Sequence, residues 1–250
     1  MKICFLSLRL DLAGGLERVV SQVASILAQK HQVRIGIVDK KTSGTYYPLD
    51  ERVMIDNLVS CRKRIDMRTI IRRIAYITGW TLPPGLAKQI FYAPDRIDAL
   101  EAYLREKQFD VVIAAANEPS LLLALIDRKR AGCENTRLYG WFHNTYHAYF
   151  HERDYYYGRQ SLAKKSLKQL DGLIVLTKQD AQTEQQNLHI KCCHIYNPLS
   201  FQSERKSGLN NRVLLFVGRM QYHTKGLDYL LQIAEKIFEK PEWSLSLIHI

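Results

Sequence analysis

Short apolar runs alternate with stretches of helical periodicity along most of this chain. Ile3–Leu8 is such a run and predicts a buried strand. Gly14-Gly15 follow it, and from Leu16 the apolar residues recur at helical spacing until a second apolar run at Val33–Val38. The order strand, glycine turn, helix, strand predicts a βαβ unit that opens a parallel sheet.

The same alternation continues to residue 196. Further strands are predicted at Val111–Ala115, Leu138–Phe142, Leu173–Leu176 and Cys193–Tyr196. Further helices are predicted at Ile97–Lys107, Pro119–Ala131, Ser161–Leu170 and Lys178–Asn187. We therefore expect residues 1–196 to form one Rossmann-like α/β domain, a parallel sheet with helices on both faces.

The polar character of residues 197–211 predicts a linker between two domains. A new strand at Val213–Val217, a helix at Lys225–Glu239 and a strand at Leu245–Ile250 follow. These predict that residues 212–250 begin a second Rossmann-like domain. A lone βαβ unit cannot bury both faces of its sheet, so we expect the chain to stop before this domain is complete.

Composition narrows the class of protein. Of the 250 residues, 46% are hydrophobic, which allows a substantial core and argues against disorder. There is no apolar run long enough to span a membrane and no signal peptide. The five cysteines have neither metal-ligand spacing nor a disulfide framework, which favours a reducing, cytoplasmic location. The net charge of +11 favours an anionic partner, and no nucleic-acid-binding signature appears.

Two positions in the first domain could carry chemistry. Gly14 and Gly15 precede a helix, where backbone N–H groups can approach an anionic ligand; a tight turn with positive φ would also explain them. His143 follows a predicted strand, and ligands bind beyond the carboxyl ends of parallel strands. The alternative is a capping or solvated histidine. His147 and His151 lie nearby but make a thin case for a metal site.

Two cations flank one predicted strand–helix loop in the second domain. Arg219 follows the strand and Lys225 opens the helix. Cations that converge on a helix N-terminus suit a diphosphate, although both could equally be solvated surface residues.

The stretch from Arg62 to Trp80 predicts a basic amphipathic helix. Its apolar residues, among them Ile70 and Ile74, fall on one helical face, and three arginines fall on another: Arg64, Arg68 and Arg72. Such a helix is typical of a membrane-surface element that could face a lipid-linked acceptor. The alternative is an ordinary surface helix that packs on the sheet.

These motifs, in this order and spacing, resemble the family 4 (group 1) retaining glycosyltransferases, which have the GT-B fold. The resemblance rests on four segments: Gly14–Val20, Asp171–Thr177, Ile195–Pro198, and Phe216–Arg219 followed by Lys225–Asp228 and Leu230-Leu231. The last segment is similar to the family's phosphate loop and is the most specific of the four. The segments together span nearly the whole chain.

The resemblance implies two Rossmann-like domains that face each other across a cleft. The N-terminal domain would hold the acceptor, and the C-terminal domain would hold a sugar nucleotide without a metal or other cofactor. His143 would contact the transferred sugar, and Arg219 and Lys225 would stabilise the leaving diphosphate. The donor-binding residues implied are Gly14, Gly15, Asn197, Gly218, Arg219 and Lys225.

The implied reaction moves a hexose or N-acetylhexosamine from a UDP-linked donor to a glycan or lipid-linked acceptor, with retention. The implied pathway is surface polysaccharide or lipopolysaccharide biosynthesis at the inner face of the cell membrane. One departure is clear: the family's downstream glutamate pair has no counterpart before Ile250. We expect truncation or a shifted reading frame near the end, and little activity from residues 1–250 alone.

Two other classes of function remain open at this level. A Rossmann-type oxidoreductase or methyltransferase would need a tighter glycine fingerprint and an acidic ribose ligand, for which Asp39 is the candidate. A non-catalytic protein could instead use the basic surface to bind anions or membranes.

Overall fold

The computed structural model describes residues 1–39, 44–58, 67–199, 203–206, 208, 210–220, 222, 225–240 and 242–249. These residues divide into two compact units, Met1–Pro198 and Leu199–Ile250, and each unit is described by itself. Arg64, which the sequence analysis assigned to the basic helix, lies outside the described residues.

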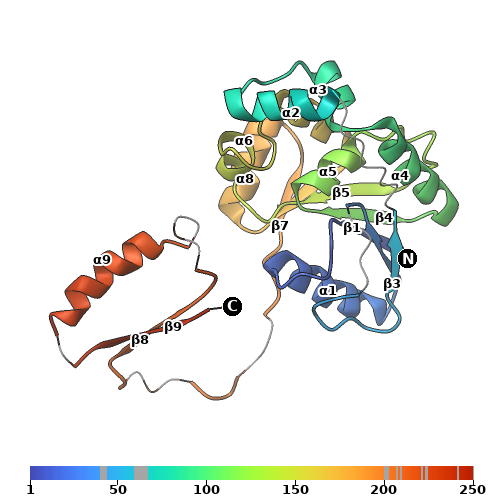
Figure 1. The fold of residues 1–250 in the computed structure, drawn as a ribbon. Coiled ribbons are helices and arrows are strands. Elements are labelled where there is room, and N and C mark those ends of the chain that lie inside the picture. The colour runs from blue at the N-terminus through green and yellow to red at the C-terminus, as the bar shows by residue number, and fades with distance from the viewer. Residues whose placement is uncertain are drawn as a thin grey trace. The chain divides into compact units, whose positions relative to one another are not determined.

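The described residues of the first unit contain a seven-stranded parallel sheet (Figure 1). Its strands are β1 (Lys2–Ser7), β2 (Gln32–Ile37), β3 (Met54–Asn57), β4 (Val111–Ala115), β5 (Arg137–Trp141), β6 (Gly172–Val175) and β7 (Cys192–His194). They lie in the order β3-β2-β1-β4-β5-β6-β7, so the strand order reverses between β1 and β4. In such sheets, ligands bind beyond the carboxyl ends of the strands at the point of reversal.

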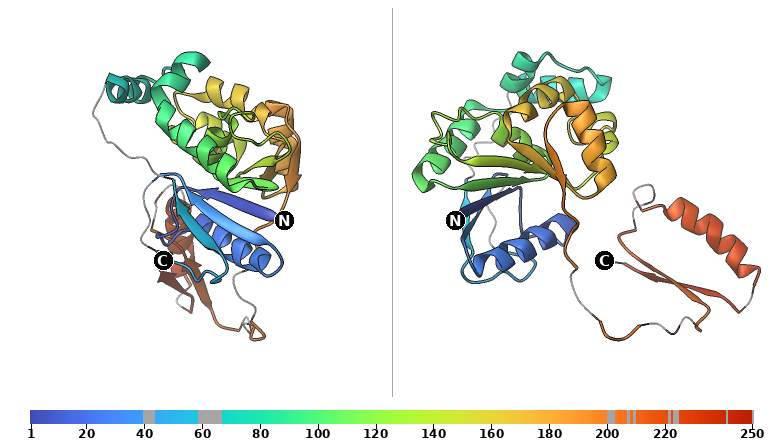
Figure 2. Two further views of the ribbon diagram at one scale, coloured as in Figure 1. Left: turned by 90° about the vertical axis from the view of Figure 1, so that its right-hand side faces the viewer. Right: turned by 180° about the vertical axis from the view of Figure 1, so that it is seen from behind.

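Helices cover both faces of this sheet. They are α1 (Gly15–Ala28), α2 (Met67–Thr78), α3 (Pro84–Phe91), α4 (Pro94–Lys107), α5 (Asn117–Ala124), α6 (Tyr146–His151), α7 (Gln160–Ser166), the short 3-10 helix η1 (Leu167–Gln169) and α8 (Lys178–Leu188). Figures 1 and 2 show α1 on one face and α4, α5 and α8 on the other. The predicted Rossmann-like α/β class is therefore confirmed.

Alternate residues of β1 serve two separate cores. Ile3 and Phe5 pack with α1, whereas Cys4 and Leu6 pack with α3, α4, α5 and α7 on the opposite face. Successive side chains of a strand point to opposite faces, so a strand buried on both sides reads as one continuous apolar run. This explains the pattern at Ile3–Leu8.

The structure differs from the predicted elements in a few places. Helix α5 ends at Ala124, not at Ala131, because the Asp127 carboxylate accepts the backbone N–H groups of Lys129 and Arg130 in a turn. Such a local side-chain bond competes with helix formation. The edge strand β3 and the short helices α3 and α6 were not predicted, since each is too short to show a clear period.

The second unit contains two parallel strands joined by one helix. These are β8 (Val213–Val217), α9 (Leu227–Phe238) and β9 (Ser244–Ile248). Gly226 caps the N-terminus of α9 with a φ of +64°, a conformation that favours glycine. Most apolar side chains of this unit remain exposed, and Ala234 is its buried apolar residue among those described.

Candidate active site at the carboxyl ends of the sheet

The glycine pair before α1 is not required by backbone strain. Gly14 caps the helix with φ −126° and ψ 156°, which any residue adopts, and Gly15 does not have a positive φ either. A Cβ atom at Gly15 would meet no atom within 4 Å. The positive-φ explanation offered from the sequence is therefore wrong. Open space above Gly15, at the N-terminus of a helix, leaves room for a ligand to approach the backbone.

His143 follows β5 and is held by the hydroxyl group of Tyr149. The backbone N–H groups of His143 and Asn144 donate to Tyr149 Oη at 2.9 and 3.2 Å. Tyr149 belongs to α6 and is 1% exposed, so this acceptor is fixed by the core. The loop that carries His143 thus has a defined position beyond the carboxyl end of the strand.

The imidazole of His143 is largely buried against the indole of Trp141, with ring centroids 4.7 Å apart. Burial lowers the pKa of His143 from 6.5 to about 4, so the ring is neutral at pH 7. Among the described residues, its buried Nε2 atom has no hydrogen-bond partner. A neutral imidazole whose Nε2 has no partner can donate a hydrogen bond to a hydroxyl group or accept one from it. With a pKa of about 4, the same ring is a weak base.

A polar pocket of about 520 Å³ lies where the strand order reverses. Its walls include Leu8 after β1, Asp39 after β2, Asn117 in α5, and the consecutive residues Asp154 and Tyr155. The volume falls within the roughly 300–1,000 Å³ typical of small-molecule sites. This is the position at which Rossmann-like sheets bind ligands.

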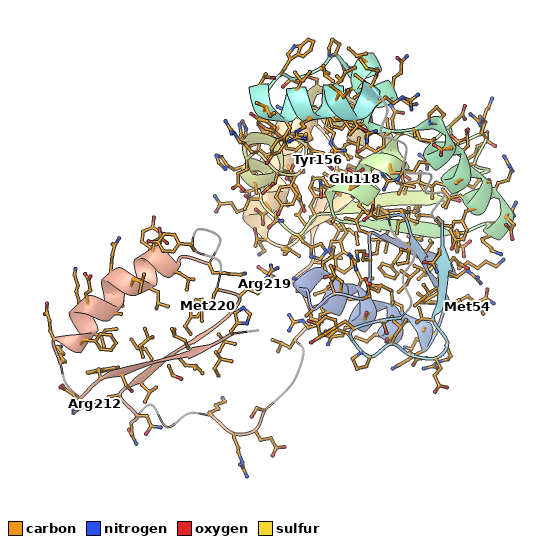
Figure 3. All side chains as sticks on the ribbon, in the orientation of Figure 1. Met54, Glu118, Tyr156, Arg212, Arg219 and Met220 are labelled. Carbon is orange, nitrogen blue, oxygen red and sulfur yellow. The ribbon has the colours of Figure 1, made fainter. Side chains whose placement is uncertain are left out.

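An ion-pair network forms the floor of the same pocket. Glu118 on α5 accepts a bond from Arg159 Nη2 at 2.8 Å and lies 3.5 Å from Arg96 Nη1. Buried Tyr92 donates to Glu118 Oε2 at 3.1 Å and accepts from Arg159 Nη1 at 2.9 Å. Figure 3 shows Glu118 with neighbouring Tyr156, whose hydroxyl donates to the carbonyl oxygen of Asn117. These side chains are therefore preorganised.

The loop in the second unit between β8 and α9 carries the two predicted cations. The N–H of Gly218 donates to the carbonyl of Ile248 on β9, which fixes the start of the loop. Arg219, labelled in Figure 3, and Lys225 are both exposed. Asn197, three residues after the end of β7, is also exposed, near the end of the first unit.

Helix α2 presents its apolar side outward. Met67, Ile70, Ile74 and Ile77, here called the apolar stripe, are 47–68% exposed. The predicted cations behave differently. Arg72 Nε donates to the carbonyl of Ile90 at 2.6 Å, and its guanidinium group lies over the Phe91 ring, so Arg72 faces α3. Arg68 is half-buried, and Arg73 is the exposed arginine of the described helix.

Within the described ranges, no three His, Cys, Asp or Glu side chains gather in a way that could hold a metal. Over those residues, the search for a helix long and apolar enough to cross a membrane also found none. A second cavity, of about 1010 Å³, lies at the amino ends of the strands beside Lys2, His31 and Thr136. The smaller pocket is the candidate site because ligands of this fold bind at the carboxyl ends of the strands.

Sequence reasoning missed the residues of the pocket floor. Glu118, Tyr92 and Arg159 come from three different helices and adjoining loops, and no local pattern connects them. The available signal was the tyrosine cluster at Tyr146, Tyr149 and Tyr155–Tyr157, which the sequence shows but which alone does not indicate a function.

Comparisons with known proteins identify the family. The model of Glycosyltransferase Family 4 matches residues 13–201. No curated protein sequence matches the chain. A variant of TarM from S. aureus, solved with fondaparinux, alpha-GlcNAc-glycerol and UDP, is 12% identical at a TM-score of 0.65, covering 98% of this chain and 71% of TarM.

Anabaena HepE, solved with UDP and glucose, is 13% identical at a TM-score of 0.52, covering 100% of this chain and 70% of HepE. At such low identity these likenesses establish the fold, which is that of GT-B enzymes. The family match covers most of the chain and agrees with the fold, so this protein belongs to Glycosyltransferase Family 4 and is a glycosyltransferase.

Proposed function

We propose that this protein transfers a hexose or N-acetylhexosamine from UDP to a glycan or lipid-linked acceptor, with retention of configuration and without a metal. The acceptor hydroxyl bonds to the anomeric carbon as the bond to the diphosphate oxygen breaks, and the hydroxyl proton is released. TarM and HepE were both solved with UDP, which supports a UDP-linked donor. The proposed setting is surface polysaccharide or lipopolysaccharide synthesis at the cytoplasmic face of the membrane.

The observation that carries this proposal is His143, neutral, largely buried and fixed beyond β5, with an unused Nε2. Its proposed role is to hydrogen-bond a hydroxyl group of the transferred sugar. Gly14, Gly15 and Asn197 are proposed to lie near the donor, with open space above Gly15 as support. Gly218 would start the loop whose Arg219 and Lys225 stabilise charge on the leaving diphosphate.

The donor assignment is tested by UDP binding to the 250-residue chain, measured by saturation-transfer NMR. Arg219→Ala and Lys225→Ala should each weaken binding about tenfold or more, because a hydrogen bond to a charged group is lost. Arg212→Ala is the matched control: Arg212 is also exposed but lies before β8, at the other end of the strand. If both loop variants bind UDP as the wild type does, these arginine and lysine residues are ordinary surface cations.

Arg219, Lys225 and His143 are also proposed to act during turnover. In transfer assays, Arg219→Ala and Lys225→Ala should each lower kcat about a hundred- to a thousandfold. His143→Ala should abolish transfer while leaving the fold intact, and EDTA should have no effect. Loss of activity on chelation, restored by a divalent cation, would contradict the metal-free mechanism.

The apolar stripe of α2 supports contact with a membrane, where a lipid-linked acceptor would lie. An amphipathic helix that packs by its mixed side and exposes its apolar side needs a partner for that side. Exposed Arg73 adds positive charge beside the stripe, and each cation near an anionic leaflet contributes about 1 kcal/mol. Because Arg72 is bonded to α3, the stripe itself, with Arg68 and Arg73, is the element to test.

Sedimentation with phosphatidylglycerol vesicles tests this surface. Ile70→Ser with Ile74→Ser should reduce binding, and binding should weaken with salt. The matched control is Leu231→Ser with Ile233→Ser on α9, which removes apolar side chains of similar exposure. A protein that ignores anionic vesicles at low salt, or that loses binding only through the α9 variant, would show that the stripe does not face a membrane.

A further inference from the structure

We infer that the pocket between the ends of β1 and β4 receives an uncharged sugar residue of the acceptor through its hydroxyl groups, and not a phosphate. This inference rests on the proposed transferase function and narrows its acceptor. The pocket is the polar one of about 520 Å³ at the carboxyl ends of the sheet.

The charge of the pocket is opposite to that of the chain. The protein carries a net charge of +11, yet the pocket is lined by three carboxylates, Asp39, Glu118 and Asp154, against two arginines, Arg96 and Arg159. This surplus of one carboxylate disfavours a phosphate group relative to an uncharged ligand. The anion preference of the whole surface therefore does not extend to this pocket.

Both arginines are already engaged by the protein. Arg159 donates from Nη2 to Glu118 and to the carbonyl of Tyr155, and from Nη1 to the hydroxyl of Tyr92. Arg96 donates from Nη2 to the carbonyl of Val38 and faces Glu118 from Nη1. Glu118 lies in the first turn of α5, so it also supplies the negative charge that the helix N-terminus favours.

The remaining wall groups suit a polyol. Carboxylates such as Asp154 accept hydrogen bonds from hydroxyl groups, and Asn117 can both donate and accept. Tyr155 adds an aromatic ring, itself 36% exposed and packed edge-on against Tyr149. A sugar ring offers matching groups: apolar C–H surface for the aromatic ring and hydroxyl groups that donate and accept hydrogen bonds.

Backbone strain marks the same walls. Ala116, which precedes Asn117, has a φ of +79°, and Tyr155 has a φ of +54°. Residues with a side chain rarely adopt such conformations, and they gather at functional sites when the surrounding structure imposes them. Here the N–H of Ala116 donates to the carbonyl of Trp141, two residues before His143.

One hydrogen bond joins the pocket to the loop that carries His143. Asn144 Nδ2 donates to Tyr155 Oη at 2.8 Å. The pocket wall and the residue proposed to contact the transferred sugar are therefore neighbours. An acceptor sugar in this pocket would lie next to the donor sugar, as transfer between them requires.

Saturation-transfer NMR on the 250-residue chain tests the inference. The probes are neutral methyl glycosides of hexoses and N-acetylhexosamines and the matching sugar 6-phosphates; inorganic phosphate, which has no carbon-bound proton to report saturation, is added as a competitor. Neutral glycosides should receive saturation at millimolar concentration, and Asp154→Asn should weaken their binding about tenfold or more. Glu134→Gln, an exposed carboxylate in the cavity at the other end of the sheet, should leave binding unchanged.

Three results would overturn the inference. In the first, no neutral glycoside receives saturation. In the second, phosphate or the sugar phosphates bind more tightly than the neutral glycosides, and more tightly still in Asp154→Asn. In the third, glycoside binding survives both Asp154→Asn and Tyr155→Ala. UDP added to the same samples reports on the proposed function separately. UDP binding without glycoside binding would refute only the acceptor assignment, whereas glycoside binding without UDP binding would refute only the donor assignment.

Discussion

Strands β1 and β8 have almost the same sequence pattern but very different surroundings. Each is a short apolar run before a loop with glycine. In β1, the residues Ile3 to Leu6 are at most 5% exposed, whereas in β8 the residues Val213, Leu214, Leu215 and Val217 are 39–59% exposed. Strand β1 pairs with β2 and β4 and has helices on both faces; β8 pairs with β9, and it is β9 that contacts α9.

The difference shows that an apolar run indicates a strand that must be buried, whereas the elements that bury it come from other parts of the chain. In the first unit, two cores on opposite faces of the sheet meet that need. In the second unit, the described residues leave apolar side chains of β8, α9 and β9 in contact with solvent. Chemically matched variants in the two units should therefore differ in their effects.

The largest difference is expected for ion pairs. Arg159→Met should destabilise the first unit by about 3–5 kcal/mol, because Glu118, whose side chain is 16% exposed, loses its shortest ion pair, while the bond from Tyr92 and the 3.5 Å contact with Arg96 remain. Arg212→Met breaks the exposed pair with Glu242 and should cost at most about 1 kcal/mol. Urea unfolding followed by circular dichroism measures both. Equal costs would mean that the floor of the pocket is not a buried network.

Leucine truncation tests the cores directly. Leu6→Ala should cost about 2–5 kcal/mol, since Leu6 is fully buried and a cavity remains. Leu215→Ala should change stability by no more than about 0.5 kcal/mol, because Leu215 is 59% exposed. The same urea titration applies. A large cost for Leu215→Ala would show that β8 is covered in solution and would remove the contrast.

Removal of the Tyr149 hydroxyl group tests whether it holds the loop of His143 in position, because the packing of the tyrosine ring is kept. Tyr149→Phe leaves the N–H groups of His143 and Asn144 without their acceptor and should cost about 1–3 kcal/mol. Tyr229→Phe on α9 should be neutral, because Tyr229 is 67% exposed. The amide resonances of His143 and Asn144 should also move in Tyr149→Phe. Unchanged amide resonances would show that Tyr149 does not position this loop.

The last comparison concerns a pH dependence that is expected from the first unit. Burial raises the pKa of Glu184 on α8 from 4.5 to about 8. Between these values the folded protein binds more protons than the unfolded chain, so stability should fall as pH rises, by up to about 1.4 kcal/mol per pH unit. Glu184→Gln should flatten this slope, and Glu235→Gln on exposed α9 should not. An unchanged slope in Glu184→Gln would assign it to another group.

The sequence by itself determined the class of fold and the family. Apolar runs and helical periods are local, so β1, α1, β4, β5, β8 and α9 could be predicted within a few residues. The motifs around Gly14, Arg219 and Lys225 resemble Glycosyltransferase Family 4. The family match over residues 13–201 confirms the membership, while the roles of Arg219 and Lys225 stay predictions. The apolar run before His143 places this residue directly after a predicted strand. In a parallel sheet the carboxyl ends of all strands lie at one edge, so the sequence also predicts that His143 lies at that edge.

The tertiary structure alone decided which side chains meet. The pocket joins Asp39, Glu118 and Tyr155, which are far apart in the sequence and follow no common period. The tertiary structure also turns Arg72 toward α3 and the apolar stripe of α2 toward solvent. Helical periodicity shows only that the helix has two faces. Periodicity is a property of one segment, but burial and charge pairing depend on the elements packed against it, and their contacts are set by the whole fold.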